Sequence, residues 1–308
     1  MVQRLRLVRQ VGRCLAGAAF LLVGTSAFAQ ESFDSPDDAV ASLVSAAKDG
    51  DKAKLLDILG PAGEDVISSG DDVADRNARD SFAAAYDEKH SLEREGDNKT
   101  ILVLGADDWP FPIPLVASNG KWKFDTAAGH EEIVLRRIGR NELSAIQASL
   151  AYVAAQRDYA AIDVDGVHPP AYAQRIVSSE GKKDGLYWPS AEGDERSPLG
   201  ALFAEASAEG YAFGGAPRPY HGYYYRVLKR QGAGAQGGAF DYVVNGRMIG
   251  GFGLIAYPAE YGNSGIMTFL VNHDGVVFQK DLGPETEERA SKIDAFAPDN
   301  GWTKVEMP

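Results

Sequence analysis

Cysteine is almost absent from this chain, and the single one, Cys14, lies within the first thirty residues. One cysteine cannot form an internal disulfide, and a chain without Cys14 has no thiol nucleophile. Basic residues are also in deficit, because 31 Lys and Arg stand against 44 Asp and Glu, a net charge of −13. This balance disfavours nucleic acid as a partner, since phosphate contacts need clustered basic side chains.

The chain also lacks a hydrophobic run long enough to stay in a membrane. An apolar run from Cys14 to Val23 follows four arginines and precedes the small-residue site Ala27-Phe28-Ala29. This order predicts a secretory signal peptide over residues 1–29, and no later stretch reaches the roughly 18 apolar residues that span a bilayer. Cleavage removes the four arginines and no acidic residue, leaving 279 residues with a net charge of −17. We therefore expect an exported protein, periplasmic if the host is Gram-negative, without an integral membrane span.

The composition gives no sign of disorder, since 44% of the residues are apolar and 24% are charged. The length favours two domains. The patterns predict an α+β fold, with N-terminal helices and a small curved antiparallel sheet in residues 30–128. A long helix packed on an antiparallel meander is expected in residues 129–283, and a short helix and tail in residues 284–308.

The first unit begins with residues that are typical of a helix start. Ser35-Pro36-Asp37-Asp38 combines an N-cap residue, a proline at the first helical position and acidic residues in the first turn. A second short helix should end at Gly60-Pro61, and a third is expected from Val73 to Leu92. A strand at 101–104 and a hairpin over 115–124 around Asn119-Gly120 follow. The proline-rich run between them cannot form a central strand.

In the second unit a helix is expected from Glu131 to Tyr159, with a kink at Gly139. Leu143, Ile146, Leu150 and Val153 recur at spacings of three and four, which predicts that this stripe is buried. The Gly- and Pro-rich residues 161–219 are expected to be irregular, with one short helix near 198–208. An antiparallel meander of about four strands is then predicted from the segments 223–228, 242–244, 248–257, 266–271 and 276–279.

Several strings that suggest catalysis or cofactor binding lack the necessary context. The glycine-rich string 232–237 is followed by a predicted strand, whereas a dinucleotide site needs a helix N-terminus there. His130-Glu131-Glu132-Ile133-Val134 begins like a zinc helix, but Val134 occupies the position of the second histidine. The acidic groups, such as Asp71-Asp72, lack calcium-loop spacing and are more typical of a solvated face. We expect no cofactor, no metal site and no assigned catalytic residue.

Aromatic residues are densest in the run from Pro219 to Arg226. On a strand, Tyr223 and Tyr225 share one face while Tyr224 and Arg226 share the other. Such a strand has either two packed faces or one core face and one that contacts a ligand, and both readings stay open. The candidate binding residues are Tyr220, His221, Tyr224, Arg226, Arg247, Tyr257, Glu260 and Tyr261.

Five strings carry a resemblance to a known family: residues 109–115, 136–143, 219–226, 242–248 and 267–272. Over these strings, and from Phe33 to about Trp302, the chain resembles a family of exported bacterial proteins catalogued as domain of unknown function 2950. The resemblance implies an envelope protein but no activity and no catalytic residues.

Two looser similarities concern architecture alone. The order of helix, tyrosine-rich strand and following strands is similar to the globular part of type IV pilin-like proteins, although the chain has no prepilin cleavage pattern. The first unit resembles the cone-shaped NTF2-like fold. We expect a non-enzymatic binding or assembly factor that contacts an envelope protein or glycan. The alternative is a carboxylate-dependent hydrolase that acts on envelope polymer.

Overall fold

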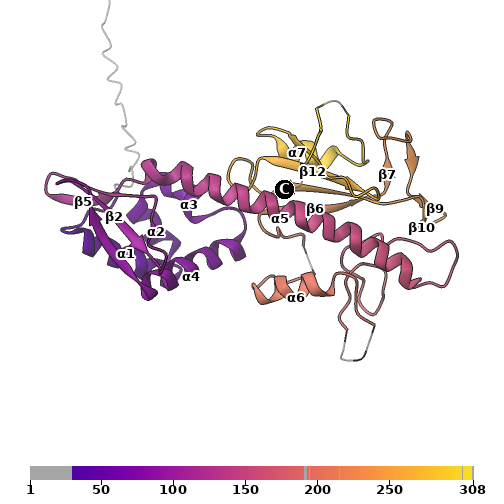
Figure 1. Cartoon of the computed structure of the whole chain (residues 1–308), viewed down its shortest axis with the longest axis horizontal. Coiled ribbons are helices and arrows are strands. Elements are labelled where there is room, and N and C mark those ends of the chain that lie inside the picture. Colours follow the sequence, from indigo (N-terminus) through magenta and orange to yellow (C-terminus); the bar gives the residue numbers. More distant parts are fainter. Residues whose placement is uncertain (1–29, 191–192, 194, 215, 300, 307–308) are drawn as a thin grey trace, which may run out of the picture.

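The computed structural model describes residues 30–306, apart from 191–192, 194, 215 and 300. The predicted signal peptide, residues 1–29, lies outside this range. Figure 1 shows an elongated molecule in which one long helix, α5 (Thr126–Ile162), runs from a first unit of helices and a small sheet into a second unit built on a larger sheet. The α+β fold class is therefore confirmed.

Helix α1 (Pro36–Asp49) begins and ends where its residues predict. The Ser35 hydroxyl accepts a hydrogen bond from the Asp38 N–H at 3.1 Å, and Gly50 ends the helix with a φ of 65°. Helix α2 (Lys52–Leu59), the 3₁₀ turn η1 (Pro61–Gly63), α3 (Glu64–Ile67) and α4 (Asp72–Glu88) follow.

Helix α4 is shorter than the helix that we predicted over Val73 to Leu92. The chain becomes extended at Lys89, and strand β1 (His90–Arg94) pairs along its whole length with β2 (Lys99–Leu104). Pairing therefore places Leu92 opposite Leu102 in a sheet, and tertiary contacts override the local helical pattern here.

The first sheet has the strand order β1-β2-β4-β5 and is antiparallel. The predicted hairpin is confirmed as β4 (Leu115–Ser118) and β5 (Lys121–Phe124). The proline run contributes only the two-residue strand β3 (Trp109–Pro110), which pairs with β2. Helices α1 and α2 pack on this sheet to form the first core, which includes Ile58, Leu102, Ile113, Leu115 and Phe124.

The long helix α5 corrects one expectation about its buried face. Leu143, placed in the predicted buried stripe, is 56% exposed. Val153 of the same stripe is buried as predicted, and Ile146 and Leu150 pack half-buried against the core. The buried side of the helix also carries small or polar residues, among them Asn141, Ala145, Ser149 and Gln156. These residues allow the helix to lie close to its neighbours, and their polar groups are bonded: the Gln156 amide exchanges two hydrogen bonds of 2.8 Å with the Ala173 main chain.

The second sheet is antiparallel with the order β14-β13-β12-β11-β6. Its strands are β6 (Tyr223–Leu228), β11 (Gly253–Pro258), β12 (Met267–Asn272), β13 (Phe278–Asp281) and β14 (Thr303–Lys304). The strand predicted over 248–257 is wrong in its first half, since Gly251 has a φ of 141° and separates β10 (Arg247–Met248) from β11. Strand β10 pairs with β9 (Val243–Val244) around the predicted Asn245-Gly246 turn, outside the main sheet.

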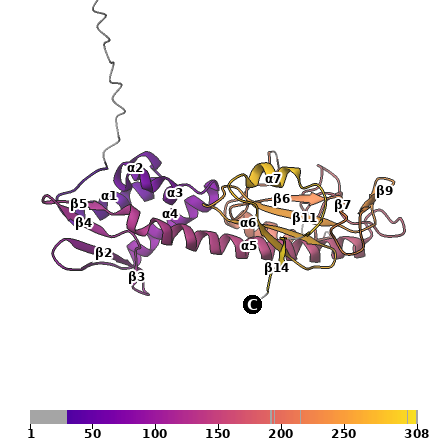
Figure 2. The same cartoon turned by 90° about the horizontal axis from the view of Figure 1, so that it is seen from above.

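Helices cover opposite sides of this second sheet (Figure 2). Helix α5 and α6 (Gly200–Ala208) pack on one face, with Tyr152, Phe203, Tyr223 and Phe252 in the core. Helix α7 (Thr286–Lys292) lies on the other face, with a core that includes Leu228, Ile255, Leu270 and Phe296. The ladder β7 (Arg230–Gln231) with β8 (Phe240–Asp241) encloses the glycine-rich string, so a strand follows this string, as predicted.

Candidate functional site

Strand β6 forms one edge of the second sheet, and both of its faces are packed. Tyr223 and Tyr225 pack in the core beside α5. On the other face, the Tyr224 ring lies 5.6 Å from the Tyr257 ring. The Arg226 guanidinium donates hydrogen bonds to the carbonyls of Ala290 and Ile293, at 2.7 and 2.8 Å. Arg226 therefore caps the C-terminal end of α7, where a cation is favoured.

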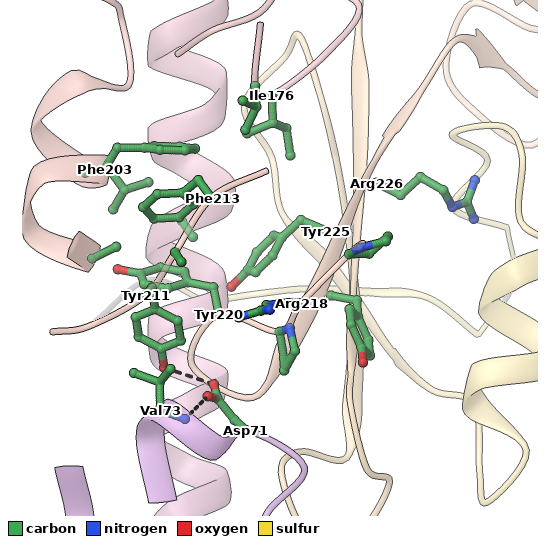
Figure 3. A pocket seen from close by; sticks show the side chains of 18 of the residues that line it. Asp71, Val73, Ile176, Phe203, Tyr211, Phe213, Arg218, Tyr220, Tyr225 and Arg226 are labelled. Atoms are coloured by element: carbon green, nitrogen blue, oxygen red, sulfur yellow. Dashed lines mark hydrogen bonds between the residues drawn. The ribbon is translucent and has the colours of Figure 1, made fainter. Parts of the chain in front are cut away.

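A pocket of about 780 Å³ lies beside this edge, between β6, α6 and the start of α4 (Figure 3). Most of its wall is apolar or aromatic. The apolar side comes from Ile176, Leu202, Phe203 and Phe213, and the Phe203 and Phe213 rings lie 4.0 Å apart. Pockets of this size and character are typical sites for apolar ligand groups.

The pocket follows the edge of β6 rather than one of its faces. Tyr224, Tyr225 and Arg226 are consecutive, so their side chains alternate between the two faces of the sheet. All three line the pocket, together with Tyr257 from β11. Because side chains from both faces line it, an occupant of the pocket would also lie against the main chain of the strand.

Asp71 closes the end of the pocket and joins the two units. Its Oδ1 accepts hydrogen bonds from the N–H groups of Val73 and Ala74, at 3.2 and 3.1 Å, and caps α4. Its Oδ2 accepts from the Tyr211 hydroxyl and the Gly222 N–H, both at 2.9 Å. Asp71 is 1% exposed, so our prediction that Asp71-Asp72 lies on a solvated acidic face is wrong for this residue. The desolvation cost of the buried carboxylate is offset by four donors.

Tyrosine hydroxyls supply most of the polar groups inside the pocket. Burial raises the pKa of Tyr220 to about 12, and burial also raises the pKa values of Tyr211 and Tyr225. These hydroxyls are therefore protonated and can donate hydrogen bonds at neutral pH. The Tyr225 hydroxyl is buried and has no hydrogen-bond partner among the described residues. Figure 3 shows it pointing toward Tyr220 and Tyr211.

Three of the four charged side chains that line the pocket already have hydrogen-bond or ion-pair partners. Both oxygens of Asp71 are occupied, and Asp72 forms an ion pair with Lys52 at 2.9 Å, which lowers the pKa of the Asp72 carboxyl. The Arg226 guanidinium is bonded to α7. Arg218 is exposed, and within the described part of the chain no hydrogen bond or ion pair engages its guanidinium. The Arg218 cation and the buried Tyr225 hydroxyl are therefore available at the site, as are the hydroxyls of Tyr220, Tyr224 and Tyr257, which no described residue bonds.

The structure brings four of the eight predicted binding residues together. Tyr220, Tyr224, Arg226 and Tyr257 all line the pocket. His221 lies next to it but points away: its Nε2 is 3.2 Å from a Glu209 carboxylate oxygen.

The other three predicted residues lie elsewhere. Glu260 is in the turn after β11, where its carboxylate accepts a hydrogen bond from the Asn263 amide at 2.9 Å. The Tyr261 hydroxyl lies 3.3 Å from an Asp281 carboxylate oxygen. Arg247 lines a different pocket of about 310 Å³ and forms an ion pair with Asp165 at 3.0 Å.

Sequence reasoning missed the apolar half of the pocket. Ile176, Phe203, Phe213 and Arg218 come from the segment 161–219, which has no strand period and only one short helix. For Asp71 a signal was present, because a Ser-Gly-Asp-Asp string directly before a helical stretch is typical of an N-cap.

Metal binding finds no support in the geometry. Among the described residues, no group of three or more His, Cys, Asp or Glu side chains is placed to hold a metal ion. His130, from the string that begins like a zinc helix, has its Nε2 3.2 Å from an Asp65 carboxylate oxygen. In the same part of the chain, no helix is long and apolar enough to cross a membrane.

The comparison with protein families identifies the relatives of this chain. Residues 30–305 match a family described as protein of unknown function (DUF2950). The chain belongs to this family. The resemblance seen in the sequence is thereby confirmed, and the match includes the whole pocket. Comparisons with curated proteins and with solved structures found no match, so the similarities to pilin-like and NTF2-like folds are not confirmed.

Proposed function

We propose that this DUF2950 protein is an exported, non-enzymatic binding or assembly factor that holds part of an envelope partner in the pocket beside β6. The observation that carries this proposal is a 780 Å³ pocket with an apolar wall and a few available polar groups, among them the Tyr225 hydroxyl and the Arg218 guanidinium. An apolar wall gives affinity through burial, and a few polar groups orient the ligand.

A protein partner fits this lining better than a glycan does. Sugars stack on aromatic rings that present an open face. Here the Phe203 ring is already stacked on the Tyr187 ring, with centroids 4.0 Å apart, and it also contacts Phe213. The wall consists of packed aromatic and aliphatic groups, which suits an apolar side chain.

The alternative function, hydrolysis with carboxylates as acid and base, receives no specific support from the geometry. The two carboxylates at the pocket are Asp71, whose oxygens accept four hydrogen bonds, and Asp72, which is paired with Lys52. A general acid must hold its proton at neutral pH, whereas Lys52 lowers the pKa of the Asp72 carboxyl, and Asp71 has no oxygen left for a substrate. We therefore argue for binding.

The pocket can be tested directly with a small probe. 8-Anilinonaphthalene-1-sulfonate has an apolar ring system and one anionic group, which match the apolar wall and Arg218. We expect saturable fluorescence enhancement, lost in Ala212→Trp, because Ala212 is an exposed residue of the pocket wall and the indole would fill the space. Ala212→Ser is the matched control and should bind as the wild type does. Equal binding by both variants would show that the probe lies elsewhere.

Partner binding needs an experiment in cells. A photo-crosslinking residue at position 212 should give adducts with a partner that mass spectrometry identifies as a protein. The same residue at Leu143, which is 56% exposed on α5 away from the pocket, serves as the control. Identical adducts at both positions, or glycan alone at position 212, would contradict the proposal.

Export is supported by the order of basic, apolar and small residues before Gln30. The protein isolated from its native cells should therefore begin at Gln30, and its periplasmic or secreted fraction should exceed the cytoplasmic one. An intact-mass measurement that finds residues 1–29 still attached would exclude cleavage.

A further inference from the structure

Strand β6 leaves part of its main chain without a partner. On one side it pairs with β11, and just before it the Ala259 N–H donates to the Gly222 carbonyl at 2.9 Å. The main-chain N–H and carbonyl groups of the even-numbered residues therefore point toward β11. Those of the odd-numbered residues point outward. At Tyr223 this outward side is used, because its N–H and carbonyl exchange hydrogen bonds with Tyr220 at 3.2 and 2.9 Å.

Tyr225 and Val227 are odd-numbered like Tyr223, so their N–H and carbonyl groups also point away from β11. Among the described residues no hydrogen bond occupies them. An open strand edge is a template for another strand, and proteins usually protect it with proline, a lysine or a bulge. The run Tyr223–Leu228 contains neither proline nor lysine. At Tyr225 the edge opens instead into the pocket described above, and Val227 lies just beyond the pocket lining.

The outward main chain at Tyr225, the apolar wall and the Arg218 cation therefore face one space, and the unpaired edge continues from it to Val227. We propose that the occupant of the pocket is an extended peptide segment of a partner protein, added as a strand to the edge of β6. Its main chain pairs with Tyr225 and Val227, a large apolar side chain lies against Phe203 and Phe213, and an acidic group lies near Arg218. This inference rests on the proposed function and names the chemistry of its ligand.

Each part of the site matches one feature of such a peptide. An added strand lies about 4.8 Å from its neighbour, and main-chain hydrogen bonds supply sequence-independent affinity. Pockets for alternate side chains supply specificity. The only charged side chain of the lining that is not already engaged by a described residue is Arg218, so charge complementarity selects an acidic residue or a terminal carboxylate. An acyl chain would leave the amides of Tyr225 and Val227 unpaired, at a cost in affinity, and a glycan lacks the regularly spaced donors and acceptors of a peptide main chain.

The test uses synthetic heptapeptides with a fixed central Phe, one Asp in either flank and all other positions randomised. The tightest binder to the full mature protein is then prepared as a series with one N-methyl group at each successive amide. We expect binding to weaken at least tenfold when the methylated amide faces β6 and less than threefold at the alternate positions. The reason is that only every second amide of the peptide pairs with β6. A uniform profile, or a library without any binder, overturns the inference.

A second measurement changes the protein rather than the peptide. Val227→Pro removes the outward N–H, and the hydrogen bonds to β11 remain because the Val227 N–H does not face that strand. We expect peptide affinity to fall at least tenfold in this variant and to stay within threefold of wild type in Val227→Ala. Equal affinities in the two variants would overturn strand addition.

The two proposals fail in different ways. If 8-anilinonaphthalene-1-sulfonate binding depends on Ala212 but no peptide shows the alternating N-methyl profile, the pocket is a binding site and the strand inference is wrong. If neither the probe nor the peptides respond to Ala212→Trp, the proposed function itself is wrong.

Discussion

At the scale of single residues, Asp71 connects more of the molecule than any predicted binding residue does. Its oxygens cap α4 in the first unit and accept from Tyr211 and Gly222 in the second. Gly222 has a φ of 73°, and a Cβ there would lie 2.5 Å from the Asn141 side-chain nitrogen. Glycine therefore lets the chain approach closely enough to give its N–H to Asp71.

Replacing Asp71 tests this role. In Asp71→Asn, an NH₂ group must face N–H and O–H donors, so at least one buried donor loses its partner. We expect a loss of about 1–3 kcal/mol in the free energy of unfolding, measured by urea titration. Asp72→Asn is the adjacent control, and because its pair with Lys52 is exposed, it should change stability by less than about 0.5 kcal/mol. Equal losses in the two variants would contradict this role.

Buried tyrosines predict how stability responds to high pH. Burial raises the pKa values of Tyr220 and Tyr242 to about 12, whereas in the unfolded chain a tyrosine titrates near 10. The stability that these protonated hydroxyls contribute is complete below about pH 10 and is lost as the pH rises toward 12. The thermal midpoint should therefore fall between pH 10 and 12, and phenolate absorbance at 295 nm should rise with unfolding. A constant midpoint across this range would refute the prediction.

At the scale of elements, α5 shows what helix signals can and cannot predict. The helix itself and part of its buried face follow from its residues, but the apolar stripe does not predict the small and polar side chains that are also buried, such as Ala145 and Gln156. Gly139 and Gly129 both lie in this helix, yet their surroundings differ. A Cβ added at Gly139 would meet no described atom from outside the helix within 4 Å, whereas a Cβ at Gly129 would be 2.4 Å from the Pro112 carbonyl oxygen.

These two glycines make a matched pair. Gly139→Ala should stabilise the protein by about 0.5–1 kcal/mol, because alanine loses less conformational entropy in a helix. Gly129→Ala should destabilise it, because the Pro112 main chain must shift. Chemical denaturation of both variants measures the two effects. Equal effects would mean that helix propensity alone governs these positions.

Local signals account for the elements that were predicted correctly. The Ser35 cap, the Asn119-Gly120 turn and the strand 223–228 each depend on residues adjacent in sequence. The pocket depends on residues that the fold gathers from distant places, such as Ile176 and Phe213, and no period marks them. The sequence therefore indicated the aromatic strand but not the wall opposite it.

At the scale of the whole molecule, the two units meet through a set of hydrogen bonds around α5, most of them partly buried. The Arg137 guanidinium donates to the carbonyls of Asp65 and Val66, at 2.6 and 2.7 Å, and also bonds the Asn263 side chain. In return, the Asn263 amide donates to the Ser68 carbonyl at 2.8 Å. One arginine therefore ties α3 to the turn after β11.

Removing this arginine should loosen the junction. We expect Arg137→Ala to lower the free energy of unfolding by about 1.5–3 kcal/mol, since charged hydrogen bonds are lost and their acceptors stay partly buried. Arg136→Ala removes the neighbouring exposed arginine, whose partner is Glu132 one turn away, and should cost less than about 0.5 kcal/mol. Calorimetry compares the two variants, and similar losses would place the junction elsewhere.

The continuity of α5 fixes the rotational phase between the two halves of the molecule. Its early residues contact the first unit and its later residues contact the second. One residue inserted after Gly139 would turn one half against the other by about 100° and move it by about 1.5 Å. Asp71 would then no longer face Tyr211, and the pocket would lose its end wall. Seven inserted residues would nearly restore the phase but separate the halves by about 10 Å. Insertions and deletions after Gly139 would therefore disrupt the pocket, although Gly139 itself does not line it.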